Sequence, residues 1–282
     1  MQHIAIQGIA GSFHDIAARQ FFCPADVETI CCDTFEEVFS TMHAQPDKCL
    51  GMMAIENTIA GSLLHNYELL RESGSRIVGE YKLHIEHALV CLPEDDWTTI
   101  KEVNSHPVAL MQCRNYLQRH PSLRAVEAYD TAGAAASIAH NHLQGHAAIC
   151  HASAAELYGL KVLENSIEDN KHNFTRFLVM AAAGNDGRKP AMKHSFGFPN
   201  KSSIVFALPH EEGSLAQVLA ILSFYKINLT KIQSLPIIGR EWEYLFYVDL
   251  QFDDYHRYHQ SIEAVRPLTR ELLLLGEYQA AE

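Results

Sequence analysis

The fold is indicated first by the stretch HIAIQGIAGS, residues 3–12. It combines a short apolar strand with a turn that contains two glycines, and a helix-like run that ends at Phe22 follows it. The same succession of strand, turn and helix begins again at Leu50, Glu102 and Ala125. Strands that alternate with helices predict an α/β architecture.

The turns of these units share polar residues at the expected helix starts. Ser, Thr or Asp stands at each expected N-cap, and the backbone N–H groups at a helix start bind anions. Because every helix benefits from a cap, one such turn alone indicates little. Several of them follow strands directly, however, and the carboxyl edge of an open α/β sheet is where ligands are held. The pattern favours a cleft for a carboxylate ligand.

Length and composition limit the possible functions. The chain has 282 residues, of which 48% are hydrophobic, and this predicts two or three globular units. There are 22 Lys and Arg against 34 Asp and Glu, a formal net charge of -12, which works against a broad nucleic-acid or anionic membrane surface. Neither an export signal nor an apolar run of about 18 residues is evident, so a cytoplasmic location is expected.

The cysteines and histidines do not predict a metal site. Seven cysteines are an odd number spread over a large chain, which indicates free thiols, and the adjacent Cys31 and Cys32 do not have a zinc spacing. The 17 histidines include no His-Glu-x-x-His pattern. His84 and His87 would lie on opposite faces of an expected strand.

A second informative stretch is NFTRFLVM, residues 173–180. It sets an amide, a hydroxyl and one cation beside two aromatic rings, and then continues as an apolar strand. This layout suits a strand whose end binds a small anion, although a buried strand that simply ends in an arginine has the same pattern. The side chains of Thr175 and Arg176 are the ones expected to bind such an anion.

The last part of the chain has a different organisation. Residues 182–201 are rich in Gly, Pro and charge, which is typical of a linker. Six segments then follow in the order strand, helix, strand, strand, helix, strand, at residues 203–208, 214–225, 229–235, 244–252, 255–266 and 272–278. This βαββαβ order is ferredoxin-like.

Five motifs occur in a fixed order along nearly the whole chain. They are Gly8-x-x-Gly11-Ser12-Phe13-His14, Ile55-Glu56-Asn57-Thr58-x-x-Gly61-Ser62, Ser105-His106-Pro107-x-x-x-x-Gln112-Cys113, Asp130-Thr131-Ala132 and Asn173-x-Thr175-Arg176-Phe177. Each motif is weak alone, but together they are specific. With them the chain resembles the monofunctional prephenate dehydratases that carry a C-terminal ACT regulatory domain.

The resemblance implies a two-lobed α/β catalytic region similar to type 2 periplasmic binding proteins, with the substrate in the cleft between the lobes. The expected limits are a catalytic region at 1–182, with one lobe at about 1–78 and 160–182 and the other at about 79–159, a linker at 183–201, and an ACT domain at 202–282. Thr175 and Arg176 would lie near the hinge.

The implied reaction is the decarboxylating dehydration of prephenate to phenylpyruvate, the committed step toward phenylalanine. It needs no cofactor, because aromatisation supplies the driving force. The resemblance makes Thr175 a hydrogen-bond donor to the departing hydroxyl. Glu56 is a candidate proton source or a brace of its loop, and Arg176 suits a fork onto a carboxylate.

The other residues expected to contact the substrate supply neutral donors or an aromatic ring. They are Ser12, Asn57, Ser62, Ser105, Gln112, Thr131, Asn173 and Phe177. Of the rings, Phe13 and Phe177 are expected chiefly to pack.

ACT domains of this family bind phenylalanine at a subunit interface, through a Gly-Ala-Leu-like helix start and a Glu-Ser-Arg-Pro segment. The corresponding residues here are Gly213-Ser214-Leu215 and Gln233-Ser234-Leu235-Pro236, so the two charged residues of the second segment are missing. Backbone amides of the first segment can still bind a carboxylate, but Gln233 is a weaker ammonium partner than Glu. The resemblance implies L-phenylalanine as effector and a homodimer or homotetramer, and a domain that only dimerises is the alternative.

Two other functions stay open. A non-catalytic amino-acid or keto-acid sensor would keep the lobes and the ACT domain, but it would have no use for a leaving-group donor at Thr175. Arogenate, which carries an ammonium where prephenate has a keto group, is an alternative substrate. A fused chorismate mutase is not expected, because no helical segment precedes the strand at His3.

Overall fold

The computed structural model describes residues 2–183 and 198–281. The chain forms two compact units, the first made of Met1–Ser62 and Lys82–Phe177, and the second of Leu63–Tyr81 and Leu178–Glu282. Most of the expected linker, residues 184–197, lies outside the described residues. The domain limits expected from the sequence stay predictions.

The first unit contains a parallel sheet in which β1 (Gln2–Gln7) lies between β2 (Val27–Cys32) and β3 (Cys49–Asn57). The helices α1 (Phe13–Phe22) and α2 (Phe35–Ala44) follow β1 and β2. The N-cap of α1 is Ser12, whose side chain accepts a hydrogen bond from the backbone N–H of Asp15. β3 is longer than expected and includes Glu56 and Asn57, because the short strand β4 (Gly61–Ser62) folds back antiparallel onto its end.

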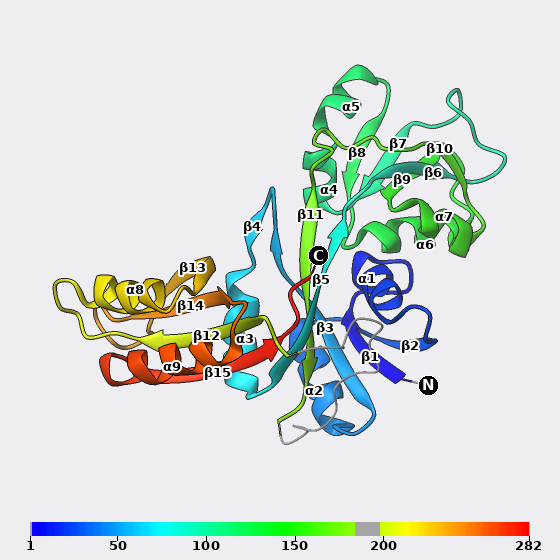
Figure 1. The fold of residues 1–282 in the computed structure, drawn as a ribbon. Helices are drawn as coiled ribbons and strands as arrows, with labels where there is room; N and C mark the ends of the chain where they lie inside the picture. The colour runs from blue at the N-terminus through cyan, green and yellow to red at the C-terminus, as the bar shows by residue number, and fades with distance from the viewer. Residues whose placement is uncertain (1, 184–197, 282) are drawn as a thin grey trace. The chain divides into compact units, whose positions relative to one another are not determined.

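The same unit contains a second, mixed sheet of five strands in the order β10-β6-β9-β7-β8. The strands are β6 (Ala88–Cys91), β7 (Glu102–Ser105), β8 (Arg124–Glu127), β9 (His146–Cys150) and β10 (Lys161–Glu164). Figure 1 shows helices on both faces of this sheet, with α4 (Pro107–Gln112) and α5 (Arg114–Arg119) on one side and α6 (Thr131–Asn141) and α7 (Ala152–Tyr158) on the other. Each face buries its own apolar core.

Several expected local features are corrected by the structure. Ser105 does not cap a helix, because its hydroxyl bonds within the sheet, and the N-cap of α4 is His106. Ser62 pairs with β3 instead of capping α3 (Leu64–Ser73), whose N-cap Leu63 makes no side-chain cap bond. The expected helix after His106 is interrupted at Cys113. The strand expected to contain both His84 and His87 ends at His84. The cap predicted at Asp130 is confirmed, since its carboxylate accepts from the Gly133 N–H.

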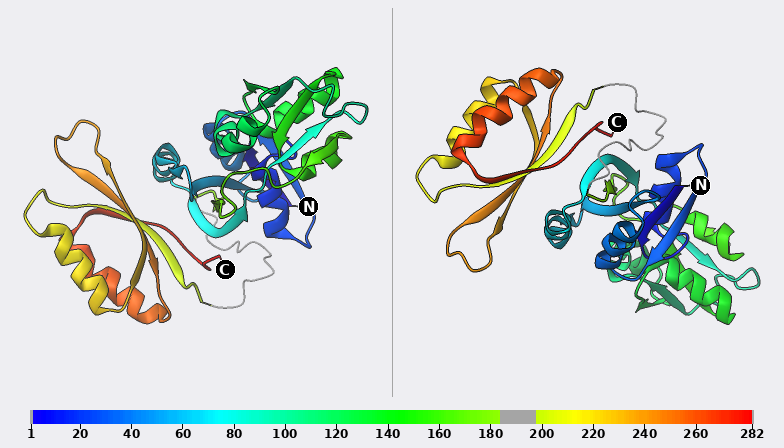
Figure 2. Two further views of the ribbon diagram at one scale, coloured as in Figure 1. Left: turned by 90° about the horizontal axis from the view of Figure 1, so that it is seen from above. Right: turned by 90° about the horizontal axis from the view of Figure 1, so that it is seen from below.

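The second unit contains an antiparallel arrangement of strands in the order β13-β14-β12-β15. They are β12 (Lys201–Ala207), β13 (Asn228–Pro236), β14 (Tyr244–Gln251) and β15 (Arg270–Tyr278). The helices α8 (Ser214–Phe224) and α9 (Tyr255–Val265) lie side by side on one face, as Figure 2 shows, and a short 3-10 helix (Arg266–Leu268) follows α9. Phe206, Leu222 and Val265 are among the residues of its core. The predicted βαββαβ order is confirmed.

Residues 63–81 add α3 and most of β5 (Arg76–His84) to the second unit. β5 pairs in parallel with β15 through Ile77 and Gly276. Lys201 Nζ donates to both carboxylate oxygens of Glu80 at 2.8 Å, and the two side chains are 7% and 0% exposed. The backbone N–H of Ala281 also donates to Glu80 Oε1, at 2.9 Å. A buried ion pair therefore joins β12 to β5.

Candidate active site

Asn57 ends β3, and its side chain ties this strand to the start of β11 (Phe174–Ala181). Its Oδ1 accepts hydrogen bonds from the backbone N–H groups of Ile59 and Ala60, at 2.9 and 2.8 Å. This fixes the amide, because a nitrogen in the same place would oppose two donors. The Nδ2 group then donates toward Asn173 Oδ1 at 2.8 Å, the Phe174 carbonyl at 3.2 Å and Thr175 Oγ1 at 2.9 Å.

This arrangement sets the direction in which the Thr175 hydroxyl can act. Since Oγ1 accepts a hydrogen bond from Asn57, the hydroxyl proton is directed away from Asn57 and can be donated to another acceptor. Among the described residues, no acceptor for that proton is present. Thr175 is half-buried, so its hydroxyl can reach a bound molecule. The site presents Thr175 as a hydrogen-bond donor.

The backbone around Asn57 and Thr175 is held from both sides. Thr58 N–H donates to the Phe174 carbonyl at 2.9 Å, and Phe174 N–H donates to Thr58 Oγ1 at 2.9 Å. The Thr58 hydroxyl in turn donates to the His172 carbonyl at 3.2 Å. The turn after β3 and the start of β11 are thus one hydrogen-bonded element, which keeps Thr175 in place with little freedom.

Arg176 lies against Glu56, the residue expected as a proton source. Arg176 Nη1 and Glu56 Oε2 are 3.6 Å apart, and the side chains are 11% and 36% exposed. The arginine is therefore mostly buried beside a carboxylate that still reaches solvent. A guanidinium has five N–H donors in a planar fork, a geometry that suits a carboxylate. Glu56 thus holds Arg176, a role that was not predicted from the sequence.

Gln112, at the end of α4, contacts a histidine from the connection between β5 and β6. Its Oε1 lies 2.9 Å from His87 Nε2, and both residues are almost fully buried. The backbone N–H of His87 donates to Glu168 Oε2 at 2.8 Å. Burial lowers the pKa of His87 below its usual range. His87 was not proposed from the sequence as a site residue.

The other expected site residues make contacts that explain them structurally. Ser105 is fully buried and donates its hydroxyl to the Ile149 carbonyl at 2.6 Å. Ser12 caps α1, and the Thr131 hydroxyl lies 3.5 Å from Asp130 Oδ1. Phe177 is 1% exposed and therefore packs, as expected for this ring. The structure brings together Glu56, Asn57, Asn173, Thr175 and Arg176. A substrate contact stays a prediction for these residues and for the others.

His14 supports this site and was not assigned a role from the sequence. Its Nε2 accepts a hydrogen bond from the backbone N–H of Ala54 in β3, at 3.1 Å. Its ring lies between Phe35 and Phe177, with centroid distances of 5.6 and 5.1 Å. Although part of the residue reaches the surface, burial of the ring lowers the pKa of His14 to about 4. A neutral imidazole therefore packs behind the Thr175-Arg176-Phe177 strand.

The lowered pKa of His14 predicts a pH-dependent stability. The unfolded chain protonates this histidine below about pH 6.5, but the folded chain does so only below about 4, so stability falls as the pH is lowered through this window and then levels off. The loss from this group is at most about 3 kcal/mol. Urea unfolding of the wild type and His14→Gln between pH 7 and 4 measures it. The variant should show a shallower slope, and equal slopes would contradict the assignment.

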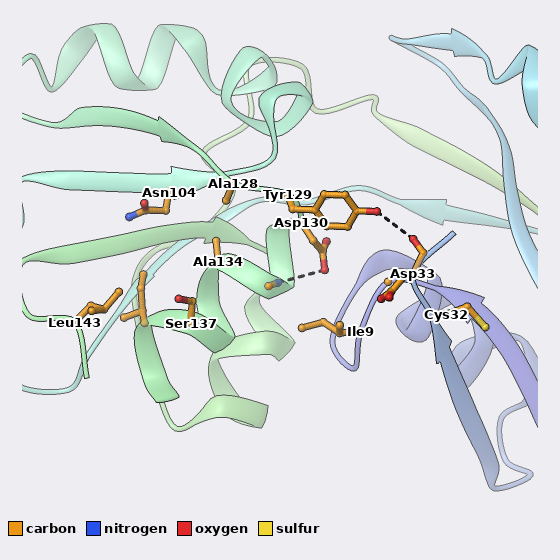
Figure 3. A pocket seen from close by; sticks show the side chains of 13 residues that line it. Ile9, Cys32, Asp33, Asn104, Ala128, Tyr129, Asp130, Ala134, Ser137 and Leu143 are labelled. Carbon is orange, nitrogen blue, oxygen red and sulfur yellow. Dashed lines mark hydrogen bonds between the residues drawn. The ribbon is translucent and has the colours of Figure 1, made fainter. Parts of the chain in front are cut away.

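A pocket of about 360 Å³ lies between the ends of the two sheets of the first unit, as Figure 3 shows. Tyr129 donates its hydroxyl across it to the Asp33 carbonyl at 3.0 Å. Asp33 and Asp130 line this pocket together with mostly apolar residues, and its lining includes no Lys or Arg. None of the residues expected to contact the substrate lines this pocket. Ser12 lies close behind its lining residue Gly8, since a Cβ at Gly8 would be 3.3 Å from Ser12 Oγ. The carboxylates of Asp33 and Asp130, without a cation in the lining, do not favour the binding of a dianionic ligand in this pocket.

Residues that could hold a metal ion do not gather in the part of the chain that the structure describes. All seven cysteines are free thiols, as predicted. Among the described residues, no helix is long and apolar enough to cross a membrane.

Comparison with known proteins identifies the family. A family model described as prephenate dehydratase matches residues 4–185. The chain belongs to the prephenate dehydratase family. The resemblance expected from the five motifs is thus confirmed, and so is the α/β fold with a C-terminal βαββαβ region.

Two curated relatives illustrate the range of this family. Arogenate dehydratase/prephenate dehydratase 6, chloroplastic, of Arabidopsis thaliana is 36% identical over 98% of this chain and 68% of its own length. The bifunctional chorismate mutase/prephenate dehydratase of Escherichia coli (strain K12) is 31% identical over 98% of this chain and 70% of its own length. This dehydratase-family chain therefore spans about two thirds of the length of these relatives. Because one relative is named as chloroplastic, the expected cytoplasmic location stays a prediction.

Three solved structures of the same fold match nearly the whole chain. Prephenate dehydratase in complex with L-Phe from Arthrobacter aurescens has a TM-score of 0.84 at 26% identity, covering 98% of this chain and 89% of that one. Prephenate dehydratase from Staphylococcus aureus subsp. aureus Mu50 has a TM-score of 0.80 at 25% identity, covering 99% and 100%. A protein described as GqqA, a novel type of quorum quenching acylases, has a TM-score of 0.85 at 29% identity, covering 99% and 98%.

Proposed function

We propose that this member of the family converts prephenate to phenylpyruvate, water and carbon dioxide. The observation that carries the proposal is the hydrogen bond from Asn57 Nδ2 to Thr175 Oγ1, because it leaves the threonine proton as a donor for a departing hydroxyl. A sensor that only binds its ligand has no need of such a donor. Family membership supplies the reaction class.

The chemistry follows from the charges involved. As the ring carboxylate leaves as carbon dioxide, the electron pair of the broken carbon–carbon bond enters the ring, and the hydroxyl at the opposite carbon departs with its own bonding pair. The ring becomes aromatic, and the departing hydroxide takes up a proton from solvent to become water. Negative charge grows on that oxygen in the transition state. A hydrogen bond from Thr175 therefore strengthens as the bond breaks, which accelerates the step.

Arg176 is proposed to bind a carboxylate of the substrate. Glu56, 3.6 Å away, holds the guanidinium and offsets part of its charge. A dianionic substrate then meets the Arg176 cation together with neutral donors. This division suits the reaction, since a ring carboxylate that is held too strongly as an ion would resist losing its charge as carbon dioxide.

Replacing Asn57 with aspartate tests the proposed orientation of Thr175. The carboxylate can still accept from Ile59 and Ala60, but its other oxygen replaces Nδ2 beside Thr175 Oγ1 and accepts a hydrogen bond from the Thr175 hydroxyl, which then no longer donates to the substrate. We expect kcat to fall by roughly tenfold to a hundredfold. Asn141→Asp is the matched control, because within the described residues the Asn141 side chain bonds only to Ser137 in its own helix. Equal turnover of both variants would contradict the proposed role of Asn57.

Arogenate is the second candidate substrate, because several relatives at 35% to 36% identity are named arogenate dehydratases. The two compounds lose the same groups from the same ring and differ in the side chain, where arogenate carries an ammonium. Steady-state kinetics with both compounds on one preparation tests the preference. A higher kcat/KM for prephenate supports the proposal, and a higher value for arogenate would replace it. No turnover of either would favour the sensor.

L-Phenylalanine is proposed as a feedback effector that binds the ACT domain. The start of α8 at Gly213 has no side-chain cap, so the backbone N–H of Leu215 is placed to receive a carboxylate. The backbone N–H of Ser214 donates to the Glu211 carbonyl at 3.3 Å. The Ser214 hydroxyl is engaged with the Pro209 and Glu211 carbonyls. In β13, Gln233 Nε2 donates to the Ser234 carbonyl, while Leu235 is buried and Pro236 ends the strand. The relative from Arthrobacter aurescens was solved with L-Phe.

The effector proposal is tested by adding L-phenylalanine to the same assay. Suppressed turnover supports a regulatory ACT domain despite Gln233, and unchanged turnover would leave this domain as an assembly module. Light scattering with and without L-phenylalanine gives the molar mass in solution, which tests the expected homodimer or homotetramer.

The geometry around Thr175 does not favour an acylase reaction with this threonine as the nucleophile. A threonine nucleophile needs a neighbouring base, whereas the described partner of Thr175 Oγ1 is the Asn57 amide, which cannot take up a proton.

A further inference from the structure

His87 lies where three parts of the first unit meet. Its side chain contacts Gln112 of α4, its backbone N–H donates to Glu168, and Ile85, two residues earlier, donates its N–H to the Asn173 carbonyl at 2.8 Å. Asn173 directly precedes the strand that carries Thr175. The short connection between β5 and β6 is thus anchored to the catalytic strand at one end and to Gln112 at the other.

Gln112 is held in the same way by the segment that leads to Asn173. Its backbone carbonyl accepts from the Asp169 N–H at 2.7 Å, and the Asp169 carboxylate accepts from the Asn115 N–H at 3.1 Å. Glu168, 3% exposed, accepts from Lys171 Nζ at 2.7 Å as well as from His87. The backbone of Gln112 and that of His87 are therefore fixed by consecutive residues of one loop, and only the side-chain contact is left to orient the amide.

The tautomer of His87 decides that orientation. His87 Nδ1 is buried and has no hydrogen-bond partner among the described residues. If Nδ1 carried the proton, a buried N–H donor would have no acceptor, which is rarer and costlier than an acceptor without a donor. The proton therefore sits on Nε2, which donates to Gln112 Oε1 at 2.9 Å. Burial also lowers the pKa of His87, so the ring is neutral.

The consequence concerns the other end of the Gln112 amide. With Oε1 accepting from His87, the Nε2 group of Gln112 is a donor with a fixed direction, and it has no acceptor in the described part of the chain. Gln112 keeps 8% of its surface exposed, and its nitrogen, unlike His87 Nδ1, is not fully shielded from solvent. It can therefore meet an oxygen of a bound substrate.

We propose that His87 is a positioning residue of the active site, which acts through Gln112 by holding its amide as an oriented donor to an oxygen of the substrate. The inference rests on the proposed function, because it gives Gln112 a substrate contact. His87 itself does not touch the reacting atoms. Its contribution is to remove the alternative, flipped amide, in which an oxygen would face the oxygens of an anionic substrate and repel them.

A double-mutant cycle separates this role from a merely structural one. His87→Phe keeps a ring against Phe13, whose centroid lies 5.6 Å away, but removes the donor to Gln112. We expect kcat/KM to fall by about tenfold. In the Gln112→Ala background the same change should alter kcat/KM by less than about twofold, because the group through which His87 acts is gone. His87→Gln, which returns an N–H donor at a similar reach, should recover most of the loss.

Two results would overturn the proposal in a variant that is folded by circular dichroism. One is unchanged kcat/KM for His87→Phe, and the other is the same fold-loss in both backgrounds. If the wild type turns over its substrate and Gln112→Ala is as active, this inference fails while the proposed function stands. If the wild type has no turnover, the proposed function fails, and the His87 role fails with it.

A readout without turnover tests the geometry in the wild-type protein. The 15N resonances of the His87 ring at pH 7 should show a protonated Nε2 and an unprotonated Nδ1, and the Gln112→Ala variant should shift the Nε2 signal. A protonated Nδ1 would contradict the orientation of the amide, whether or not the single variants fold.

Discussion

Thr175→Ala should lower kcat by about a hundredfold or more, with a change in KM of only a few fold. The hydroxyl is proposed to bind the departing oxygen most strongly when its bond to the ring breaks, so its loss raises the barrier more than it weakens substrate binding. Steady-state kinetics with prephenate measure both constants.

Two further substitutions at this position control for shape. Thr175→Val keeps the branched side chain, which suits the strand β11, but lacks the hydroxyl, and it should be as slow as the alanine variant. Thr175→Ser restores the hydroxyl that accepts from Asn57, and it should regain activity to within about tenfold of the wild type. A valine variant with near-normal kcat would show that the hydroxyl has no part in the chemistry.

Lys201→Met should destabilise the protein by about 3 to 5 kcal/mol. The change leaves the Glu80 carboxylate, 0% exposed, without its lysine and with the Ala281 N–H as a remaining neutral donor. A buried carboxylate that loses its lysine is destabilised, because it must either stay ionised with less compensation or take up a proton. The free energy of unfolding in urea is the measurement.

Two control variants accompany this test, one at the same buried ion pair and one at an exposed ion pair. Lys201→Met combined with Glu80→Gln removes both charges, and it should recover a large part of the lost stability. Arg270→Ala breaks a pair with Glu243 whose side chains are 57% and 26% exposed, and it should cost less than about 1 kcal/mol. A loss for Lys201→Met no larger than that for Arg270→Ala would contradict a stabilising role of the buried pair.

The sequence predicted the parts of the fold that have strong local signals. The apolar strands at His3, Leu50 and Ala147 and the whole βαββαβ region were found because their periodicity and turns agree. The strand β2, with the sequence VETICC, was not predicted, because its polar residues interrupt both the apolar run and the alternation. The cap at His106 was missed for a different reason, since histidine is not among the usual N-cap residues.

The sequence predicted most residues of the candidate site, but it did not predict the contacts that these residues make. Asn57 was expected as a substrate contact, but its amide is taken up by Asn173 and Thr175, which lie 116 and 118 residues later in the chain. His87 was missed because its partner Gln112 lies 25 residues away and no local pattern links them. Contacts at such separations follow from tertiary packing, which neither periodicity nor motif spacing encodes.

The most direct test of the account is the conversion of prephenate by the purified protein. Product formation is followed by ultraviolet absorbance of phenylpyruvate, in parallel for the wild type and Thr175→Val at equal concentration. We expect steady phenylpyruvate formation by the wild type and a rate at least about a hundredfold lower for the variant. Equal rates for both proteins, or no phenylpyruvate above the spontaneous background with the wild type, would contradict it.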